Sequence, residues 1–206
     1  MARVALDVWS DYLCPWCNVA ATRLRALEAE FGSELELRWR SFLLRPMPEP
    51  GGRDLERFRR YTESWQRAAA EEPTAEFRVW ASDEGPPTHS VPAHLVAKAA
   101  ATFGPEEFER MHRALLHAYF VENRDISRAP TLAALWREVG LPERELERVT
   151  DPELLELIRS EHNEAVEMGV GGVPAVRMEG NDVAISGAQP IEVYRRWIRR
   201  ALDATP

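Results

Sequence analysis

The stretch DVWSDYLCPWC, residues 7–17, decides how the rest of the chain is interpreted. Its pattern is that of an apolar strand that ends, a short turn, and the first turn of a helix. Cys14 and Cys17 are the only two cysteines of the chain, and two residues separate them. A Cys-x-x-Cys pair at a strand-to-helix junction is typical of a redox-active dithiol. We therefore expect thiol–disulfide chemistry at this junction.

The position of the pair predicts a separate role for each thiol. The first turn of a helix has unpaired backbone N–H groups and the positive end of the helix dipole, which stabilise a thiolate at Cys14. Its pKa should lie below the ~8.5 of a free cysteine, and the thiolate is the form that attacks a disulfide. Pro15 suits the first helical position, and Cys17 follows about one turn later on the same face. We predict Cys14 as the nucleophile and Cys17 as the resolving thiol, with Pro15 and Trp16 adjusting the reduction potential.

Other interpretations of the motif and its neighbours stay open. The alternatives for the thiols are a buried structural pair or a zinc site, but zinc needs about four ligands and the chain has a single Cys-x-x-Cys. We therefore predict no metal site. Trp16 is either an exposed apolar side chain or a substrate contact beside the active thiol, and we favour the substrate contact. Asp11 is expected to brace the turn rather than take part in the chemistry.

Asp7 interrupts the apolar run of residues 4–9. A carboxylate inside a buried strand is costly unless it is paired or protonated. One interpretation is a buried acid near the thiols that moves protons and supports the reaction. The other is a residue on a solvated face of the strand, and a shift of one residue exchanges the two faces. The sequence leaves both interpretations open.

Composition limits the class of protein. The chain has 206 residues, of which 45% are hydrophobic, so a packed core is expected. The net charge of −8 argues against nucleic acid or an anionic membrane as the main partner. No run of 18 apolar residues predicts a transmembrane helix, and the first residues lack the pattern of a signal peptide. We expect a cytoplasmic protein, where a lone cysteine pair is more often catalytic than structural.

The predicted elements fall into a strand–helix–strand start, a long helical region, and a strand–strand–helix end. In chain order they are a strand at 4–9, a helix at 14–30, a strand at 34–40, helical patterns over 53–168 that begin with one helix at 55–69, strands at Ala175–Met178 and 183–186, and a helix from Pro190. This order predicts an α/β, thioredoxin-like fold with a four-stranded mixed sheet and a large helical insertion. The Pro- and Gly-rich loop 45–52 suggests a boundary. We predict a thioredoxin-like domain of residues 1–45 plus 169–206 and a helical insertion domain of 46–168.

These segments together resemble a known family over nearly the whole chain. The Cys-Pro-Trp-Cys motif, the helical insertion, GVGGVPA at 169–175 and ISGAQP at 185–190 resemble the DsbA-like thiol–disulfide oxidoreductases. Ala93-His94, LHAYF at 116–120 and RDI at 124–126 are similar to the FrnE-like subgroup. The resemblance implies a cis peptide bond before Pro174, packed against the cysteines. It also implies that the Val173 backbone faces the substrate and pairs with it like an added strand.

Two departures and one related family qualify the expected activity. The chain has Pro-Trp between the cysteines, where the best-known periplasmic members have Pro-His, and His89-Ser90 where the subgroup usually has Asn-Thr. The chain also resembles 2-hydroxychromene-2-carboxylate isomerases and kappa-class glutathione transferases, which usually carry Ser at the position of Cys14. The intact thiol pair favours disulfide exchange over that glutathione-dependent chemistry, and a redox-inert binding module is a third alternative. We expect no bound cofactor, thiols and disulfides of proteins or small molecules as partners, and glutathione as a candidate redox partner.

Overall fold

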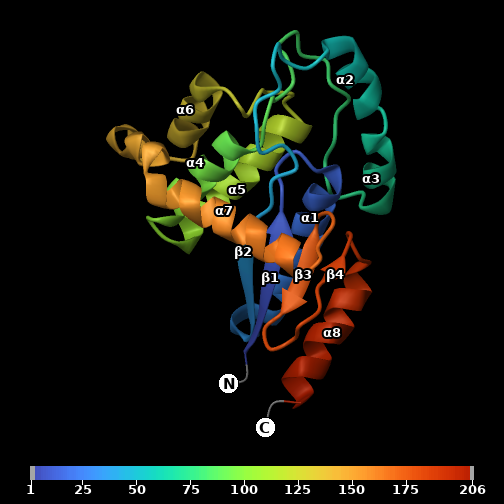
Figure 1. Ribbon diagram of the computed structural model, residues 1–206. Helices are drawn as coiled ribbons and strands as arrows, with labels where there is room; N and C mark the ends of the chain where they lie inside the picture. The colour runs from blue at the N-terminus through green and yellow to red at the C-terminus, as the bar shows by residue number, and fades with distance from the viewer. Residues whose placement is uncertain (1–2, 205–206) are drawn as a thin grey trace.

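The computed structural model describes residues 3–204 and contains one four-stranded sheet with the strand order β2-β1-β3-β4 (Figure 1). The strands are β1 (Val4–Ser10), β2 (Leu35–Ser41), β3 (Ala175–Met178) and β4 (Ile185–Ser186). β1 runs parallel to β2 and antiparallel to β3, and β4 is antiparallel to β3. The predicted mixed sheet is therefore confirmed. All seven residues of the central strand β1 are buried, which explains its near-continuous apolar sequence.

Helices cover both faces of the sheet. On one face, Leu6 and Val8 of β1 pack with Leu24 of α1 (Pro15–Phe31) and Ile198 of α8 (Ile191–Ala204). On the other face, the ring of Trp9 packs near α7 (Pro152–Glu167), and its Nε1 donates a hydrogen bond of 2.9 Å to a backbone carbonyl of that helix. Side chains alternate between the two faces of a strand, so β1 contributes to both layers.

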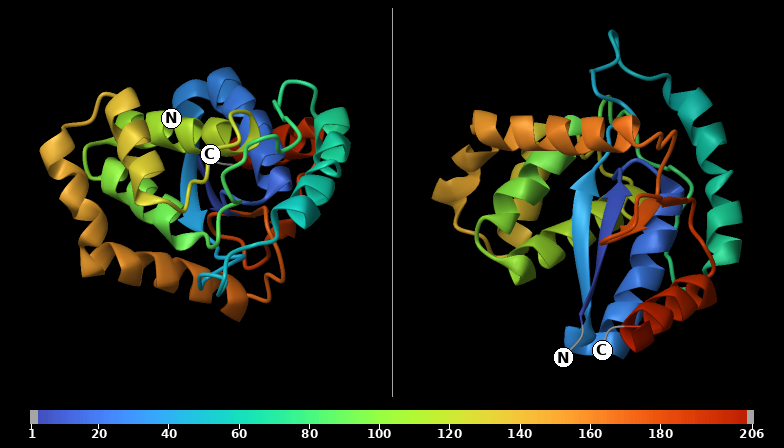
Figure 2. Two further views of the ribbon diagram at one scale, coloured as in Figure 1. Left: turned by 90° about the horizontal axis from the view of Figure 1, so that it is seen from above. Right: turned by 60° about the horizontal axis from the view of Figure 1, so that its bottom comes forward.

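The remaining helices, apart from a short 3₁₀ helix directly before β2, lie between β2 and β3 in the chain. They are α2 (Leu55–Thr62), α3 (Trp65–Glu71), α4 (Val91–Ala101), α5 (Pro105–Phe120) and α6 (Ala129–Glu138), with short 3₁₀ helices at Gly32–Glu34 and Glu143–Thr150. Figure 2 shows α2 and α3 at one end of the molecule and α4 to α7 at the other, with α1 between them. Within residues 3–204, no helix is long and apolar enough to cross a membrane.

Two predicted elements differ from the structure. The single helix expected over 55–69 is two helices, because the chain turns after Thr62, whose Oγ1 donates to the Arg59 carbonyl and accepts the Trp80 N–H. The turn places the Trp65 side chain in the core. The strand expected over 183–186 is limited to Ile185–Ser186, and Val183 is 72% exposed.

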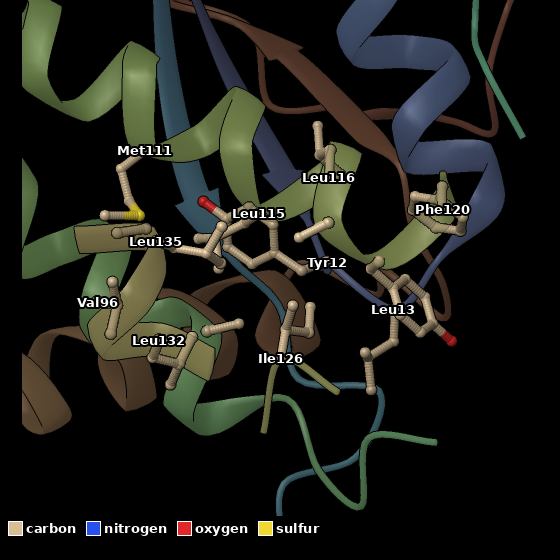
Figure 3. Close-up of a cluster of buried hydrophobic side chains, with 14 of the residues drawn as sticks. Tyr12, Leu13, Val96, Met111, Leu115, Leu116, Phe120, Ile126, Leu132 and Leu135 are labelled. Atoms are coloured by element: carbon tan, nitrogen blue, oxygen red, sulfur yellow. The ribbon is translucent and has the colours of Figure 1, made fainter. Parts of the chain in front are cut away.

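The turn that follows β1 is anchored in the core of the helical region. The side chains of Tyr12 and Leu13 lie among Leu115, Leu116 and Ile126, as Figure 3 shows. The Tyr12 hydroxyl also forms a 3.0 Å hydrogen bond with Nδ1 of the buried His112 of α5. The inserted helices therefore fix the turn that carries the cysteines.

Candidate active site

The two cysteines occupy the start of α1, as predicted. Cys14 is the N-cap residue with an extended backbone, and Pro15 is the first residue of the helix. The Cys17 N–H donates to the Cys14 carbonyl at 3.0 Å, which closes the first helical turn. Both cysteines are free thiols, with Cys14 6% exposed and Cys17 fully buried. Of the two cysteines, only Cys14 has surface that a substrate in solution can reach.

The surroundings of the thiols separate their acidities. A hydrogen bond from the Cys17 thiol lowers the pKa of Cys14 below its ordinary value, and the backbone N–H groups of Cys17 and Trp16 act in the same direction against the effect of burial. Burial raises the pKa of Cys17 well above its ordinary value, and the bond to Cys14 and its charge add to this. The first helical turn therefore favours one thiolate, at Cys14, with a neutral Cys17 donating to it.

The loop before β3 brings a backbone edge to the nucleophile. The Val173–Pro174 peptide bond is cis, as the family resemblance implied. The Cys14 thiol donates to the Val173 carbonyl at 3.4 Å. No acceptor for the Val173 N–H is found among residues 3–204, and Val173 itself is half-buried. Trp16 lies in the first turn of α1 with 38% of its surface exposed.

Asp7 lies elsewhere, which corrects both expectations for this residue. It is buried, but its carboxylate oxygens accept hydrogen bonds from Arg177 at 2.8 Å and Arg40 at 3.1 Å. These arginines also contact Glu164 and Glu161 of α7. Because Asp7 alternates with the residues that pack against α1, its side chain points to the α7 side of the sheet. It is therefore part of an ion-pair network and not a proton carrier beside the thiols.

Among the buried acidic residues, Asp11 lies closest to Cys14 and Cys17 along the sequence. Its Oδ1 accepts the Leu13 N–H at 2.7 Å and its Oδ2 accepts the Leu44 N–H at 2.8 Å. The Ser90 hydroxyl is a further hydrogen-bond partner, and burial raises the pKa of Asp11 from 3.8 to about 6. Its own N–H donates to the Cys17 sulfur at 3.5 Å. Asp11 braces the turn, as expected, and also joins that turn to the segment after β2 and to the start of α4.

Sequence reasoning missed these links because they join residues far apart in the chain. Ser90 lies in the unusual His89-Ser90 pair, and its Oγ accepts the Arg45 N–H at 3.2 Å while its hydroxyl contacts Asp11. A short polar side chain at a helix N-terminus indicates a cap, but it does not reveal a partner from another segment. Within residues 3–204, no group of three or more His, Cys, Asp or Glu side chains is arranged to hold a metal ion.

The fold and the dithiol at the start of α1 define the class as thiol–disulfide oxidoreductases of the thioredoxin superfamily. A family model described as the DSBA-like thioredoxin domain matches residues 5–199, so the chain belongs to this family. It is 28% identical over 141 residues to "Uncharacterized protein YwbO" of Bacillus subtilis (strain 168), a match that covers 67% of each chain.

Solved structures of other proteins are similar to almost the whole chain. A "probable DsbA oxidoreductase SCO1869" from Streptomyces coelicolor has a TM-score of 0.79 at 24% identity, covering 99% of this chain and 92% of that one. The "cytosolic disulfide reductase DsbM" from Pseudomonas aeruginosa has a TM-score of 0.76 at 21% identity, covering 97% and 98% of the two chains. DsbM has also been solved with GSH. At these identities the likeness is one of fold.

Proposed function

We propose that the protein exchanges disulfides with protein and small-molecule thiols in the cytoplasm, with Cys14 as the nucleophile and Cys17 as the resolving thiol. The observation that carries the proposal is the contrast between the two sulfurs. Cys14 is the more accessible and more acidic thiol, and Cys17 is fully buried behind it with a raised pKa. A nucleophile and a resolving group need this difference.

The exchange proceeds in two successive displacements at sulfur. The Cys14 thiolate attacks one sulfur of the substrate disulfide, whose S–S bond breaks, and the other substrate sulfur leaves as a thiolate. The product is a mixed disulfide at Cys14. The Cys17 thiolate then attacks the Cys14 sulfur, releases the second substrate thiolate and forms the Cys14–Cys17 disulfide. The substrate gains two electrons and the protein loses two, and two molecules of glutathione would return them.

In this proposal, the same contacts keep Cys17 protonated until the resolving step. Part of the rise in the Cys17 pKa comes from its bond to Cys14 and from the charge there. Once Cys14 is in a mixed disulfide, its sulfur is uncharged and this part of the rise disappears. Cys17 therefore becomes more acidic at the step in which it must attack.

The backbone at Val173 supplies a docking edge for the substrate. Its N–H has no acceptor among the described residues, and its carbonyl lies within 3.4 Å of the Cys14 sulfur. A peptide segment next to the substrate disulfide would form main-chain hydrogen bonds there, as an added strand does. In this proposal, Trp16, two residues after the nucleophile, offers an exposed aromatic contact.

Trapping of mixed disulfides tests the division of roles. Cys17→Ser should accumulate a covalent adduct with a cysteine-containing peptide disulfide, whereas Cys14→Ser should not, and mass spectrometry identifies both products. Equal trapping by both variants, or by neither, would contradict the assignment. A wild-type pair that stays reduced while the protein binds glutathione tightly would instead favour a glutathione-dependent isomerase or transferase.

A further inference from the structure

A groove of about 910 Å³ begins at Leu13, the residue before the nucleophile. It runs between the segment after β2, which contributes Leu44, Arg45 and Met47, and helix α2. Its size is at the upper end of the range for ligand sites in proteins. A bound segment of polypeptide could therefore contact the groove while its disulfide meets Cys14.

The rim of this groove is apolar and unusually open. Leu44 is 45% exposed, Met47 is 74% exposed and Tyr61 is 46% exposed. These three are among the eight large hydrophobic side chains that are exposed within residues 3–204. Because these three exposed side chains line the same groove, we interpret the groove as an interaction site.

The groove also carries more positive than negative charge. Arg45, Arg53 and Arg57 line it together with Glu49 and Asp54, although the whole chain has a net charge of −8. Glu49 is the acidic neighbour of two of the arginines, at 2.8 Å from Arg45 and 4.0 Å from Arg53. A local excess of arginine in an acidic protein favours an anionic partner at that place.

The second acidic residue of the groove, Asp54, forms a hydrogen bond within its own helix. Asp54 is the N-cap of α2, and its Oδ1 accepts the Arg57 backbone N–H at 2.6 Å. The guanidinium of Arg57 forms no ion pair with any residue of the described part of the chain. It is exposed on the groove and remains available to a carboxylate of a ligand.

Arg53, which lines the groove, is held in place by neighbouring groups. Its guanidinium lies 4.4 Å from the centre of the Phe58 ring and donates to the Pro87 carbonyl at 3.3 Å. The buried hydroxyl of Tyr119 is a further neighbour, and burial lowers the pKa of Arg53. A partly buried cation with its closest carboxylate 4.0 Å away gains from an additional carboxylate, and its rigid setting orients it for one.

We propose that this groove selects disulfide substrates whose polypeptide carries acidic side chains close to the reactive cysteine, with Arg53 and Arg57 as the residues that determine the preference. The proposal rests on the proposed function, because the groove acts on the same reaction at Cys14. The apolar rim contacts the neighbouring apolar side chains of the substrate, and the two guanidinium groups bind its carboxylates. A substrate without acidic residues still reacts, but more slowly.

The test compares three disulfide-linked peptides of the same sequence, in which the positions flanking cysteine are Glu, Gln or Lys. The second-order rate of exchange with the reduced protein is measured for each at low ionic strength. The wild type should react about tenfold faster with the Glu peptide than with the Gln peptide, since a charge-assisted hydrogen bond contributes on that scale. Lys should be slower than Gln.

Arg53→Gln and Arg57→Gln should each reduce the Glu-to-Gln ratio, and the double variant should reduce it further than either. Arg60→Gln is the matched control, since Arg60 lies on the same helix, has its closest ion-pair contact at 3.8 Å with Glu56, and does not line the groove. Equal ratios in Arg57→Gln and Arg60→Gln, or no preference in the wild type, would overturn the proposal. Failure of all three peptides to react would instead contradict the proposed function.

Discussion

Replacement of Asp11 by Asn tests how the active-site turn is held and how its charge acts on the nucleophile. In the folded protein Asp11 has a pKa of about 6, against an ordinary value of 3.8, because burial disfavours the carboxylate. Ionising it therefore costs about 3 kcal/mol more in the folded protein than in the unfolded chain. Asn has no such cost, but it has one acceptor oxygen where Asp has two. Either the Leu13 or the Leu44 N–H then loses its partner, which costs about 1–3 kcal/mol.

The sign of the pH dependence follows from these values. Because the folded protein holds the Asp11 proton more tightly than the unfolded chain, the wild type loses stability as the pH rises from 3.8 to about 6. The Asn side chain of the variant does not titrate, so the variant does not lose stability in this way. Asp11→Asn should therefore be less stable than the wild type by about 1–3 kcal/mol near pH 4, and close to it or more stable at about pH 8.

Two measurements check this prediction. Urea unfolding of both proteins across that pH range gives the difference in the free energy of unfolding, which should change by about 3 kcal/mol in favour of the variant. Ultraviolet absorbance of the thiolate gives the pKa of Cys14, which should fall in the variant because the Asp11 charge raises it. A difference in stability that does not vary with pH, together with an unchanged Cys14 pKa, would refute the reasoning.

The remaining predictions concern the two buried polar clusters around β1. Asp7→Asn should destabilise the protein by about 1–3 kcal/mol, since Arg40 and Arg177 lose a charged hydrogen-bond acceptor. It should leave the rate of thiol exchange unchanged. Urea unfolding and exchange kinetics measure the two effects, and a slower exchange would restore a chemical role for Asp7. Tyr12→Phe should cost about 1–3 kcal/mol by removing the partner of the buried His112 Nδ1, and a melting temperature equal to that of the wild type would show that the bond contributes nothing.

The parts of the fold that could be predicted are those encoded by local patterns. The β1–α1–β2 start and β3 were placed within about one residue, because apolar periodicity and a Pro after the N-cap mark them directly. The break between α2 and α3 was missed, since it depends on a hydrogen bond from Trp80 to Thr62, 18 residues earlier. The short β4 was overestimated, because two β-branched residues near a turn do not guarantee a pairing partner.

The site shows the same division between local and distant information. Residue types and spacing predict the position of Cys14 and Cys17 at the start of α1, and the family resemblance implies the cis bond before Pro174. Asp7 was misplaced, because the facing of a strand is reversed by a shift of one residue and its arginine partners come from β2 and β3. The groove beside Leu13 was not predicted either, since its arginines are ordinary surface residues until α2 and the segment after β2 lie side by side.

A redox titration of the Cys14–Cys17 pair in glutathione buffers tests the central claim most directly. The fraction of protein in the disulfide form is measured by alkylation of the remaining thiols and mass spectrometry. We predict one two-electron transition between dithiol and Cys14–Cys17 disulfide, in which each ~30 mV of buffer potential corresponds to a tenfold change in the ratio of the two forms. A pair that stays fully reduced in every buffer, including oxidised glutathione alone, would contradict the claim.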